Sequence, residues 1–234
     1  MSRTFSVEAA GAARSDAVGR HRLRHSVSLV VSLLLVALQH AYPAMATSGP
    51  AYLVKDIWPG SPSSFLSGFA EANGYLFFAA YDGVHGVELW KSDGTEEGTV
   101  LVKDIGLGFG SEPGSLTNLG GTLFFAATDA TAGRELWKSD GTAAGTLLVK
   151  DISSLGHSNP SYLTPVNHQL VFAAAGELWK TDGTSAGTVR VMFFPGSGGT
   201  GLSYLANVNG TVFFAGFDQA SGLGRRPANR RSSW

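Results

Sequence analysis

The sequence predicts an all-β fold, built as a β-propeller-like array of four-stranded antiparallel sheets. Three observations predict it: one octapeptide occurs three times, apolar runs of strand length recur at nearly constant spacing, and glycine is abundant whereas charge is scarce. Of the 234 residues, 31 are glycine and 15% are charged. Self-similarity over tens of residues is typical of repeat architectures. Abundant glycine suits turn-rich β structure better than helices.

The octapeptide Glu-Leu-Trp-Lys-Ser-Asp-Gly-Thr fills residues 88–95 and 135–142, and it returns at 177–184 with Thr in place of Ser. We interpret it as a strand followed by a turn, because glycine tolerates positive φ and an Asp side chain bonds to nearby backbone. The residues of this structural repeat motif are Glu88, Leu89, Trp90, Asp93, Gly94, Thr95, Glu135, Leu136, Trp137, Asp140, Gly141, Thr142, Glu177, Leu178, Trp179, Asp182, Gly183 and Thr184.

Four segments recur in a fixed order in each repeat. A turn-rich stretch such as 115–118 precedes an apolar run, the octapeptide follows, and a β-branched run such as 100–105 comes last. The apolar runs begin at residues 76, 123, 170 and 212, which are 47, 47 and 42 residues apart. The third repeat is shorter because it lacks a loop between residues 172 and 177. Short apolar runs bounded by turn residues predict strands, so each repeat predicts a four-stranded antiparallel meander.

The apolar runs do not alternate with polar residues, so both faces of each sheet should be covered. Stacked propeller blades provide such a double cover about every 47 residues. A β-solenoid is the alternative, although its coils are usually shorter and its strands parallel. The array is either a closed ring or an open arc, because closed propellers have at least four blades and the fourth repeat is incomplete. We expect residues 51–57 to be a lone fourth strand that completes the last blade with strands near 203–208 and 211–216.

Residues 1–46 are expected to be a signal peptide that is cleaved near Ala46. Three Arg residues at positions 20, 22 and 24 precede an apolar run over 27–38, and small residues follow at 43–46. This order is typical of secretory signals, and the run is short for a membrane span. An uncleaved anchor and a wrongly assigned start are the alternatives. We expect no membrane span after cleavage, and a secreted, extracellular or cell-surface protein, with the periplasm as another possibility.

The formal net charge of −1 conceals a segregation of charge along the chain. Residues 47–224 hold eight basic and 16 acidic residues, whereas most arginines lie in the leader and the tail. An acidic body repels phosphate backbones, so nucleic acid is not expected as a partner. The chain has no cysteine, so stability must come from packing or from a metal rather than from disulfides.

The motif residues offer few candidates for chemistry. Trp90, Trp137 and Trp179 either form an aromatic platform for sugars or pack between blades, and their identity in every repeat favours packing. The motif Asp residues favour turn capping over Ca²⁺ binding, because Ca²⁺ needs six to eight oxygen ligands. We therefore expect no cofactor, and Ca²⁺ is the alternative. We interpret Glu88 with Lys91, and Lys103 with Asp104, as surface or edge charges.

Other residues point to no recognised catalytic arrangement. His85, His157 and His168 occupy non-equivalent repeat positions without zinc-ligand spacing. Residues 106–110, Gly-Leu-Gly-Phe-Gly, mimic part of a dinucleotide loop, but no helix pattern follows. We interpret this segment as a connection between blades. No pair of carboxylates stands out as glycosidase machinery, so no catalytic residue is predicted.

The octapeptides, together with Val-Lys-Asp-Ile tetrads that begin at Val54, Val102 and Val149, resemble the ELWxxDGT repeat family of exported bacterial proteins. The resemblance covers residues 51 to about 223 and implies a propeller-like fold, but little chemistry. The sequence departs from the pattern at 191–194, where the Lys-Asp pair is replaced, and after Leu223, where a fourth Glu-Leu-Trp is expected.

The predicted organisation is a signal peptide over 1–46, repeats over 47–223 and an Arg-rich tail over 224–234. The repeat units span about 51–105, 106–152, 153–194 and 195–223. Because the pattern stops where the fourth Glu-Leu-Trp is due, we expect a frameshift or a truncation there.

We expect an exported, non-enzymatic module that binds a protein or glycan ligand and that self-associates through open blade edges. The alternatives are a fragment of a propeller-type hydrolase or lyase, and a truncated gene product without function.

Overall fold

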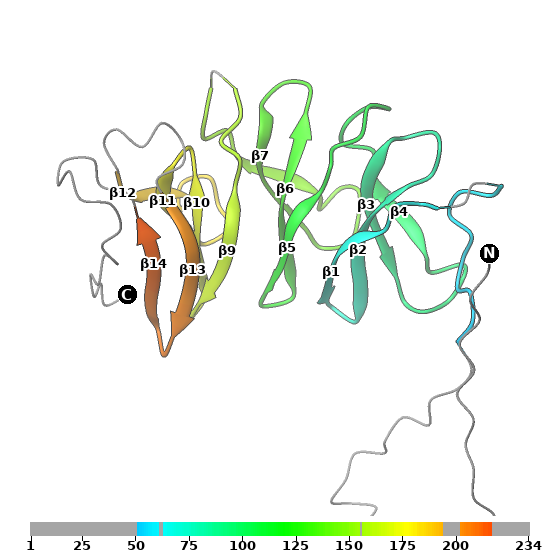
Figure 1. Ribbon diagram of the computed structural model, residues 1–234, viewed down its shortest axis with the longest axis horizontal. Coiled ribbons are helices and arrows are strands. Elements are labelled where there is room, and N and C mark those ends of the chain that lie inside the picture. Colours follow the sequence, from blue (N-terminus) through cyan, green and yellow to red (C-terminus); the bar gives the residue numbers. More distant parts are fainter. Residues whose placement is uncertain (1–50, 61–62, 155, 194–201, 217–234) are drawn as a thin grey trace, which may run out of the picture. The chain divides into compact units, whose positions relative to one another are not determined.

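The repeats form antiparallel sheets that follow one another in chain order (Figure 1). The computed structural model describes residues 51–60, 63–154, 156–193 and 202–216. All strand pairings within these ranges are antiparallel, and the same residues contain no helix. The all-β prediction is confirmed, and the parallel pairing that a β-solenoid requires does not occur in this part of the chain. The predicted leader and Arg-rich tail lie outside the described residues.

Each of the first three repeats folds into a four-stranded meander, and two strands of the fourth repeat are described. The first sheet contains β1 (Ser67–Ala72), β2 (Tyr75–Tyr81), β3 (Val87–Ser92) and β4 (Val100–Lys103). The second contains β5 (Gly114–Leu119), β6 (Thr122–Asp129), β7 (Gly133–Ser139) and β8 (Leu147–Lys150). The third contains β9 (Ser161–Val166), β10 (Gln169–Ala174), β11 (Glu177–Thr181) and β12 (Val189–Met192). The last contains β13 (Leu202–Val208) and β14 (Thr211–Gly216).

The expectation for residues 51–57 is wrong in two respects. This segment is described, but it forms no strand, and it does not join the sheet of β13 and β14, which among the described residues contains only these two strands. Its backbone runs beside the first sheet, which is far along the chain from the strands it was expected to join. The segment nevertheless occupies a repeat position, as the contacts of Lys55 show below.

Tight turns join the first two strands of each sheet. Asn73 and Gly74, which join β1 to β2, have φ of 49° and 76°, and Asn209 and Gly210 repeat this with 50° and 79°. Two successive residues with positive φ make the turn whose twist matches a β-hairpin, and Asn-Gly is its favoured sequence. The shortened third repeat joins β10 to β11 with only Ala175 and Gly176, as its missing loop predicted.

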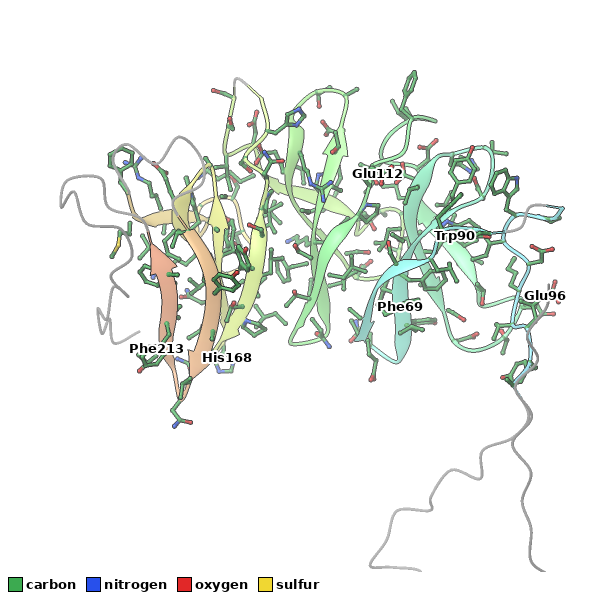
Figure 2. The ribbon with its side chains drawn as sticks, viewed as in Figure 1. Phe69, Trp90, Glu96, Glu112, His168 and Phe213 are labelled. Carbon is green, nitrogen blue, oxygen red and sulfur yellow. The ribbon has the colours of Figure 1, made fainter. Side chains whose placement is uncertain are left out.

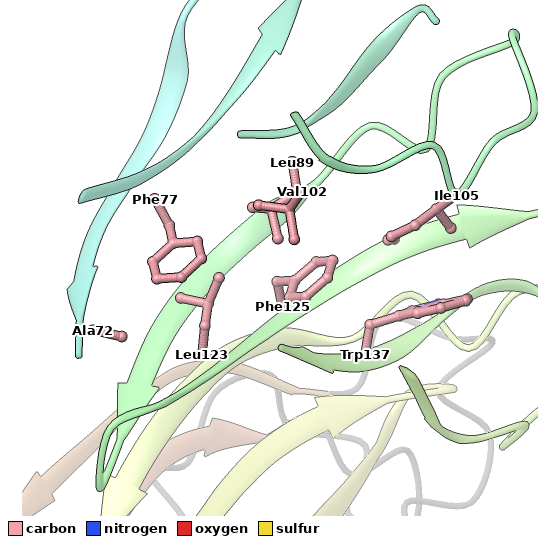
Figure 3. Close-up of a cluster of buried hydrophobic side chains, with 9 residues drawn as sticks. Ala72, Phe77, Leu89, Val102, Ile105, Leu123, Phe125 and Trp137 are labelled. Carbon is pink, nitrogen blue, oxygen red and sulfur yellow. The ribbon is translucent and has the colours of Figure 1, made fainter. Parts of the chain in front are cut away.

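Apolar side chains fill the space between the first and second sheets (Figure 3). Phe77 and Leu89 of the first sheet pack with Leu123, Phe125 and Trp137 of the second. A second cluster joins the second sheet to the third, and another joins the third to β13 and β14. Both faces of the inner sheets are therefore covered, which explains why their apolar runs do not alternate with polar residues.

The first strands of successive repeats lie side by side. β1 contacts β5, β5 contacts β9, and β9 contacts β13, and Figure 1 shows these strands following one another along one edge of the sheets. Residues 106–110 lie between β4 and β5, so their interpretation as a connection between repeats is confirmed. The repeat therefore places equivalent residues of neighbouring first strands close together.

Candidate binding face

The turn after the octapeptide strand is held by its own side chains. The Asp93 carboxylate accepts hydrogen bonds from the Thr95 amide at 2.9 Å and the Thr95 hydroxyl at 2.8 Å. Thr95 Oγ1 accepts from the Gly98 amide at 2.9 Å, and the Thr99 hydroxyl donates to the Thr95 carbonyl at 2.6 Å. A Cβ on Gly98 would overlap the Asp93 carboxylate. Each constant residue of Asp-Gly-Thr-x-x-Gly-Thr thus has a role in the turn.

The other two octapeptides repeat this network. Asp140 accepts from Thr142, and Asp182 accepts from Thr184, through the same amide and hydroxyl groups. These bonds hold the pKa of Asp140 and Asp182 below the ordinary value, as Thr95 does for Asp93. One carboxylate with two local donors explains the turn without a bound cation. No cluster of three or more His, Asp or Glu residues suited to a metal occurs in the described ranges.

The octapeptide glutamates correct the sequence interpretation. Glu88 is fully buried and is not a surface charge. Its carboxylate accepts hydrogen bonds from the Gly106 amide at 2.7 Å and from the Ser111 hydroxyl at 2.5 Å, both in the connection to β5. Burial raises the pKa of Glu88 above its ordinary value, although these hydrogen bonds oppose the shift. Glu135 binds Ser158 in the next connection in the same way, so in the first two repeats the glutamate joins the sheet to the connection that follows it. Glu177 of the third repeat differs, because it accepts a hydrogen bond from Arg190 at 3.1 Å in an ion pair.

The lysines assigned to surface pairs also have other partners. Lys103 Nζ donates to the Thr146 carbonyl of the second sheet at 2.8 Å. Lys91 Nζ lies 4.4 Å from the centre of the Tyr75 ring, as in a cation–π contact. Among the described residues, Lys91 forms no ion pair with Glu88 and Lys103 forms none with Asp104, so the interpretation as paired edge charges is wrong.

The octapeptide tryptophans pack against neighbouring sheets or segments. Trp90 and Trp137 are each 7% exposed, and Trp137 contacts the first sheet in the cluster of Figure 3. The indole nitrogens of Trp90, Trp137 and Trp179 are buried without a hydrogen-bond partner. The rings therefore contribute apolar area to the packing of the sheets, and those of Trp90 and Trp137 are too buried to present their faces to a soluble sugar. Trp179 is partly buried against the cluster between the second and third sheets.

The histidines lie in separate local settings. His85 Nδ1 lies 2.6 Å from the Asp82 carboxylate, whose other oxygen accepts from the Val84 and His85 amides. The Asp82 hydrogen bond raises the pKa of His85. His157 Nδ1 accepts a hydrogen bond from the Arg134 amide at 2.7 Å. A histidine whose ring nitrogen holds a neighbouring connection has a structural role, so these residues do not form a common site.

A bulge recurs in the first strand of every repeat. Gly68, Ser115, Tyr162 and Tyr204 have φ of 66°, 56°, 53° and 57°, and the pairing register shifts beside each of them. Glycine adopts this left-handed conformation without steric cost, whereas a bulky residue there is uncommon. The first two repeats hold small residues at this position, and the last two hold tyrosine.

The two tyrosines form an exposed aromatic pair. The ring centres of Tyr162 and Tyr204 lie 6.2 Å apart, with 44° between the ring planes. Both side chains are exposed, Tyr204 more than Tyr162. Holding a non-glycine residue in a left-handed conformation costs about 1–3 kcal/mol, and such strain clusters at ligand sites. The pair therefore combines backbone strain with exposed aromatic surface.

A small hollow lies at the same end of β9 as the tyrosine pair. Ser158, Asn159 and Ser161 line it together with His157 and Leu202. Its volume of about 160 Å³ is below the range of roughly 300–1,000 Å³ for sites that enclose a small ligand. The hollow fits a single polar group of a ligand whose remainder lies on the surface.

Sequence reasoning missed the tyrosine pair, although the sequence contained a signal for it. Residues 68, 115, 162 and 204 follow the same 47, 47 and 42 spacing as the apolar runs. A repeat position that changes from Gly and Ser to two tyrosines marks broken symmetry. The invariant tryptophans, by contrast, are buried in the first two repeats and partly buried in the third.

A scan of the chain against protein-family models found no match, and a search among curated proteins found no similar protein. Among the described residues, no helix is long and apolar enough to cross a bilayer. The function must therefore be argued from the geometry of the chain itself.

Proposed function

We propose that this chain is an exported, non-enzymatic binding module in which the sheets are blades of a propeller-like array. Contacts between successive first strands and apolar packing between successive sheets support the blade arrangement. The resemblance to the ELWxxDGT repeat family is consistent with it. The first strands of propeller blades line the central channel, so the tyrosine pair would face a ligand that enters there.

The observation that carries the proposal is the exposed pair of Tyr162 and Tyr204 on strained bulges. Two aromatic faces about one sugar ring apart fit a glycan, because the apolar C–H faces of pyranoses stack on aromatic rings. The hollow beside β9 offers the side chains of Asn159 and Ser161 for the sugar hydroxyls. We therefore favour a glycan over a protein ligand.

A glycan array tests the proposal directly. The exported chain is applied beside Tyr162→Ala and Tyr204→Ala variants, and bound oligosaccharides are then titrated in solution. A ring contact worth about 0.5–1.5 kcal/mol predicts that each substitution weakens binding by roughly two- to twelvefold. Phe109→Ala is the matched control, because Phe109 is an exposed aromatic residue in the connection after β4.

Two outcomes would overturn the proposal. Binding that is unchanged in both tyrosine variants would show that the pair is not the site. Release of shortened sugars from a bound oligosaccharide would show an enzyme, as expected for a fragment of a propeller-type hydrolase or lyase. Binding to proteins but to no glycan would contradict the glycan ligand, while the proposal of a binding module would stand.

A further inference from the structure

Every inner sheet has two distinct faces, and the repeat fixes what each face contacts. We call the face toward the next sheet the trailing face and the face toward the preceding sheet the leading face. Between the first and second sheets, the trailing residues Phe77 and Leu89 contact the leading residues Leu123, Phe125 and Trp137. The next interface repeats this pattern, with Phe124 and Leu136 packed against Leu170 and Phe172.

The leading face of the first sheet is incompletely covered. Leu76 occupies the register position of Leu123 and Leu170, since all three pair with the last strand residue of their octapeptide. Leu76 is 43% exposed, whereas Leu123 and Leu170 are fully buried. Phe78, Ala80 and Trp90 lie on the same face but are buried, and Ile57 packs against them.

The segment that holds Ile57 imitates the fourth strand of a preceding sheet. Lys55 Nζ donates to the Thr99 carbonyl of the first sheet at 2.9 Å. Lys103 of β4 makes the same bond to Thr146 of the second sheet, and Lys150 of β8 makes it to Thr188 of the third. The chain therefore supplies the outermost contact of a preceding sheet on the first sheet, but this segment leaves Leu76 exposed.

Within the described residues, the trailing face of the last sheet is also incompletely covered. Phe213 of β14 holds the register position of Phe77 and Phe124, but it is 43% exposed and they are buried. Val208 holds the position of Ala72 and is also exposed, whereas Ala72 is buried. Figure 2 shows Phe213 and the first-sheet residues Phe69 and Trp90 at opposite ends of the row of sheets.

We propose that copies of this chain associate head to tail, with the trailing face of β13 and β14 of one copy packed on the leading face of the first sheet of the next. The occupant is a second copy because the chain itself contains both halves of an interface that it already forms three times internally. Phe213 and Val208 then take the place that Phe77 and Ala72 fill inside the chain, and they cover the exposed side chains of Leu76 and Phe69.

Two different surfaces meet in this contact, so it is heterologous and either closes into a ring or continues as a filament. Each copy contributes four sheet positions, so a closed pair has eight, within the range of about four to eight blades in propellers. The inference does not depend on ligand binding at the tyrosine pair.

Complementation between two end variants tests the proposal. Leu76→Arg places a charge on the leading face, and Phe213→Arg places a charge on the trailing face. Both side chains are partly exposed in the single chain, so we expect each variant to fold. The exported chain is studied by size-exclusion chromatography with light scattering. The wild type should show at least twice the mass of one chain, and each variant alone should show the mass of one chain.

An equimolar mixture of the two variants retains one intact interface and no other. It should therefore form a species of two chains and nothing larger, which a symmetric contact between identical faces would not produce. Phe109→Arg, at an exposed apolar side chain away from both faces, is the matched control and should behave as the wild type. Val208→Arg provides a second trailing-face variant should Phe213→Arg lose its circular dichroism spectrum.

A wild-type chain that remains monomeric up to about 100 μM would overturn the proposal, because interfaces of standard size bind more tightly than this. Association that persists in both single variants would show that other surfaces hold the copies together. A mixture that stays monomeric would exclude the head-to-tail arrangement.

Discussion

The ammonium group of Lys55 donates a hydrogen bond to the carbonyl oxygen of Thr99 at 2.9 Å, as Lys103 does to Thr146 in the next repeat. In each case the lysine of a Val-Lys-Asp-Ile tetrad binds the turn between the third and fourth strands of the next sheet. This contact shows that residues 51–57 hold the place of a fourth strand, although they form none. The repeated lysine is therefore a connector between sheets.

Loss of the lysine hydrogen bond between sheets should lower the free energy of unfolding of the protein. Lys103→Met keeps the apolar stem but leaves the Thr146 carbonyl without this donor. A hydrogen bond from a charged group contributes about 1.5–3 kcal/mol when well ordered, and we expect the partly buried bond to lie near the lower end. Urea unfolding should show that loss, and Lys103→Arg should recover most of it. Equal midpoints for Lys103→Met and the wild type would contradict the prediction.

The last glycine of the turn motif should tolerate no side chain while its aspartate is present. A Cβ on Gly145 would overlap the Asp140 carboxylate, so Gly145→Ala should lower the free energy of unfolding by about 1–3 kcal/mol. The same substitution should cost less in an Asp140→Ala background, because the clash is then absent. A double-mutant cycle measures this coupling, expected at about 0.5–3 kcal/mol. Additive effects of the two changes would contradict the assigned contact.

Trp137 should depend on its volume and not on its indole N–H. Because this buried donor has no hydrogen-bond partner, Trp137→Phe should lose only part of the packing, with a cost below about 2 kcal/mol. Trp137→Ala leaves a cavity between the first two sheets and should cost about 3–5 kcal/mol. Thermal unfolding followed by circular dichroism compares the variants. Equal losses for Phe and Ala would indicate a hidden partner of the indole nitrogen.

The pair of His85 and Asp82 should give a local pH response. The hydrogen bond to Asp82 raises the pKa of His85 above 6.5, so the stabilisation of this loop is fully present below pH 6.5 and is lost as the pH rises through the raised value. Titration of the imidazole signals by NMR should show the raised pKa, and Asp82→Asn should bring it back toward 6.5. Asp129→Asn, in the equivalent loop of the second repeat, is the control that should leave His85 unchanged.

The sequence predicted the strands and turns well because their causes are local. The Asp93 turn closes through bonds that span at most four residues, and Asn73 with Gly74 sets the hairpin geometry by itself. It misjudged Glu88 and Lys103, whose partners Ser111 and Thr146 lie 23 and 43 residues away. Opposite charges that are close in sequence suggest a surface ion pair, but the fold brings other hydrogen-bond partners to these two residues from distant parts of the chain.

The candidate site shows the same division. The repeat spacing placed Tyr162 and Tyr204 at equivalent positions, but spacing cannot tell which face of a strand a residue occupies at a bulge, where the register shifts. By itself the sequence determined the repeated all-β sheets, the turn chemistry and the apolar faces, because short-range hydrogen bonds and side-chain hydrophobicity specify them. Only the tertiary structure decided that Glu88 is buried, that the two tyrosines meet and that Leu76 and Phe213 remain exposed. These properties depend on which sheet lies beside which, and that is set by packing between residues far apart in the chain.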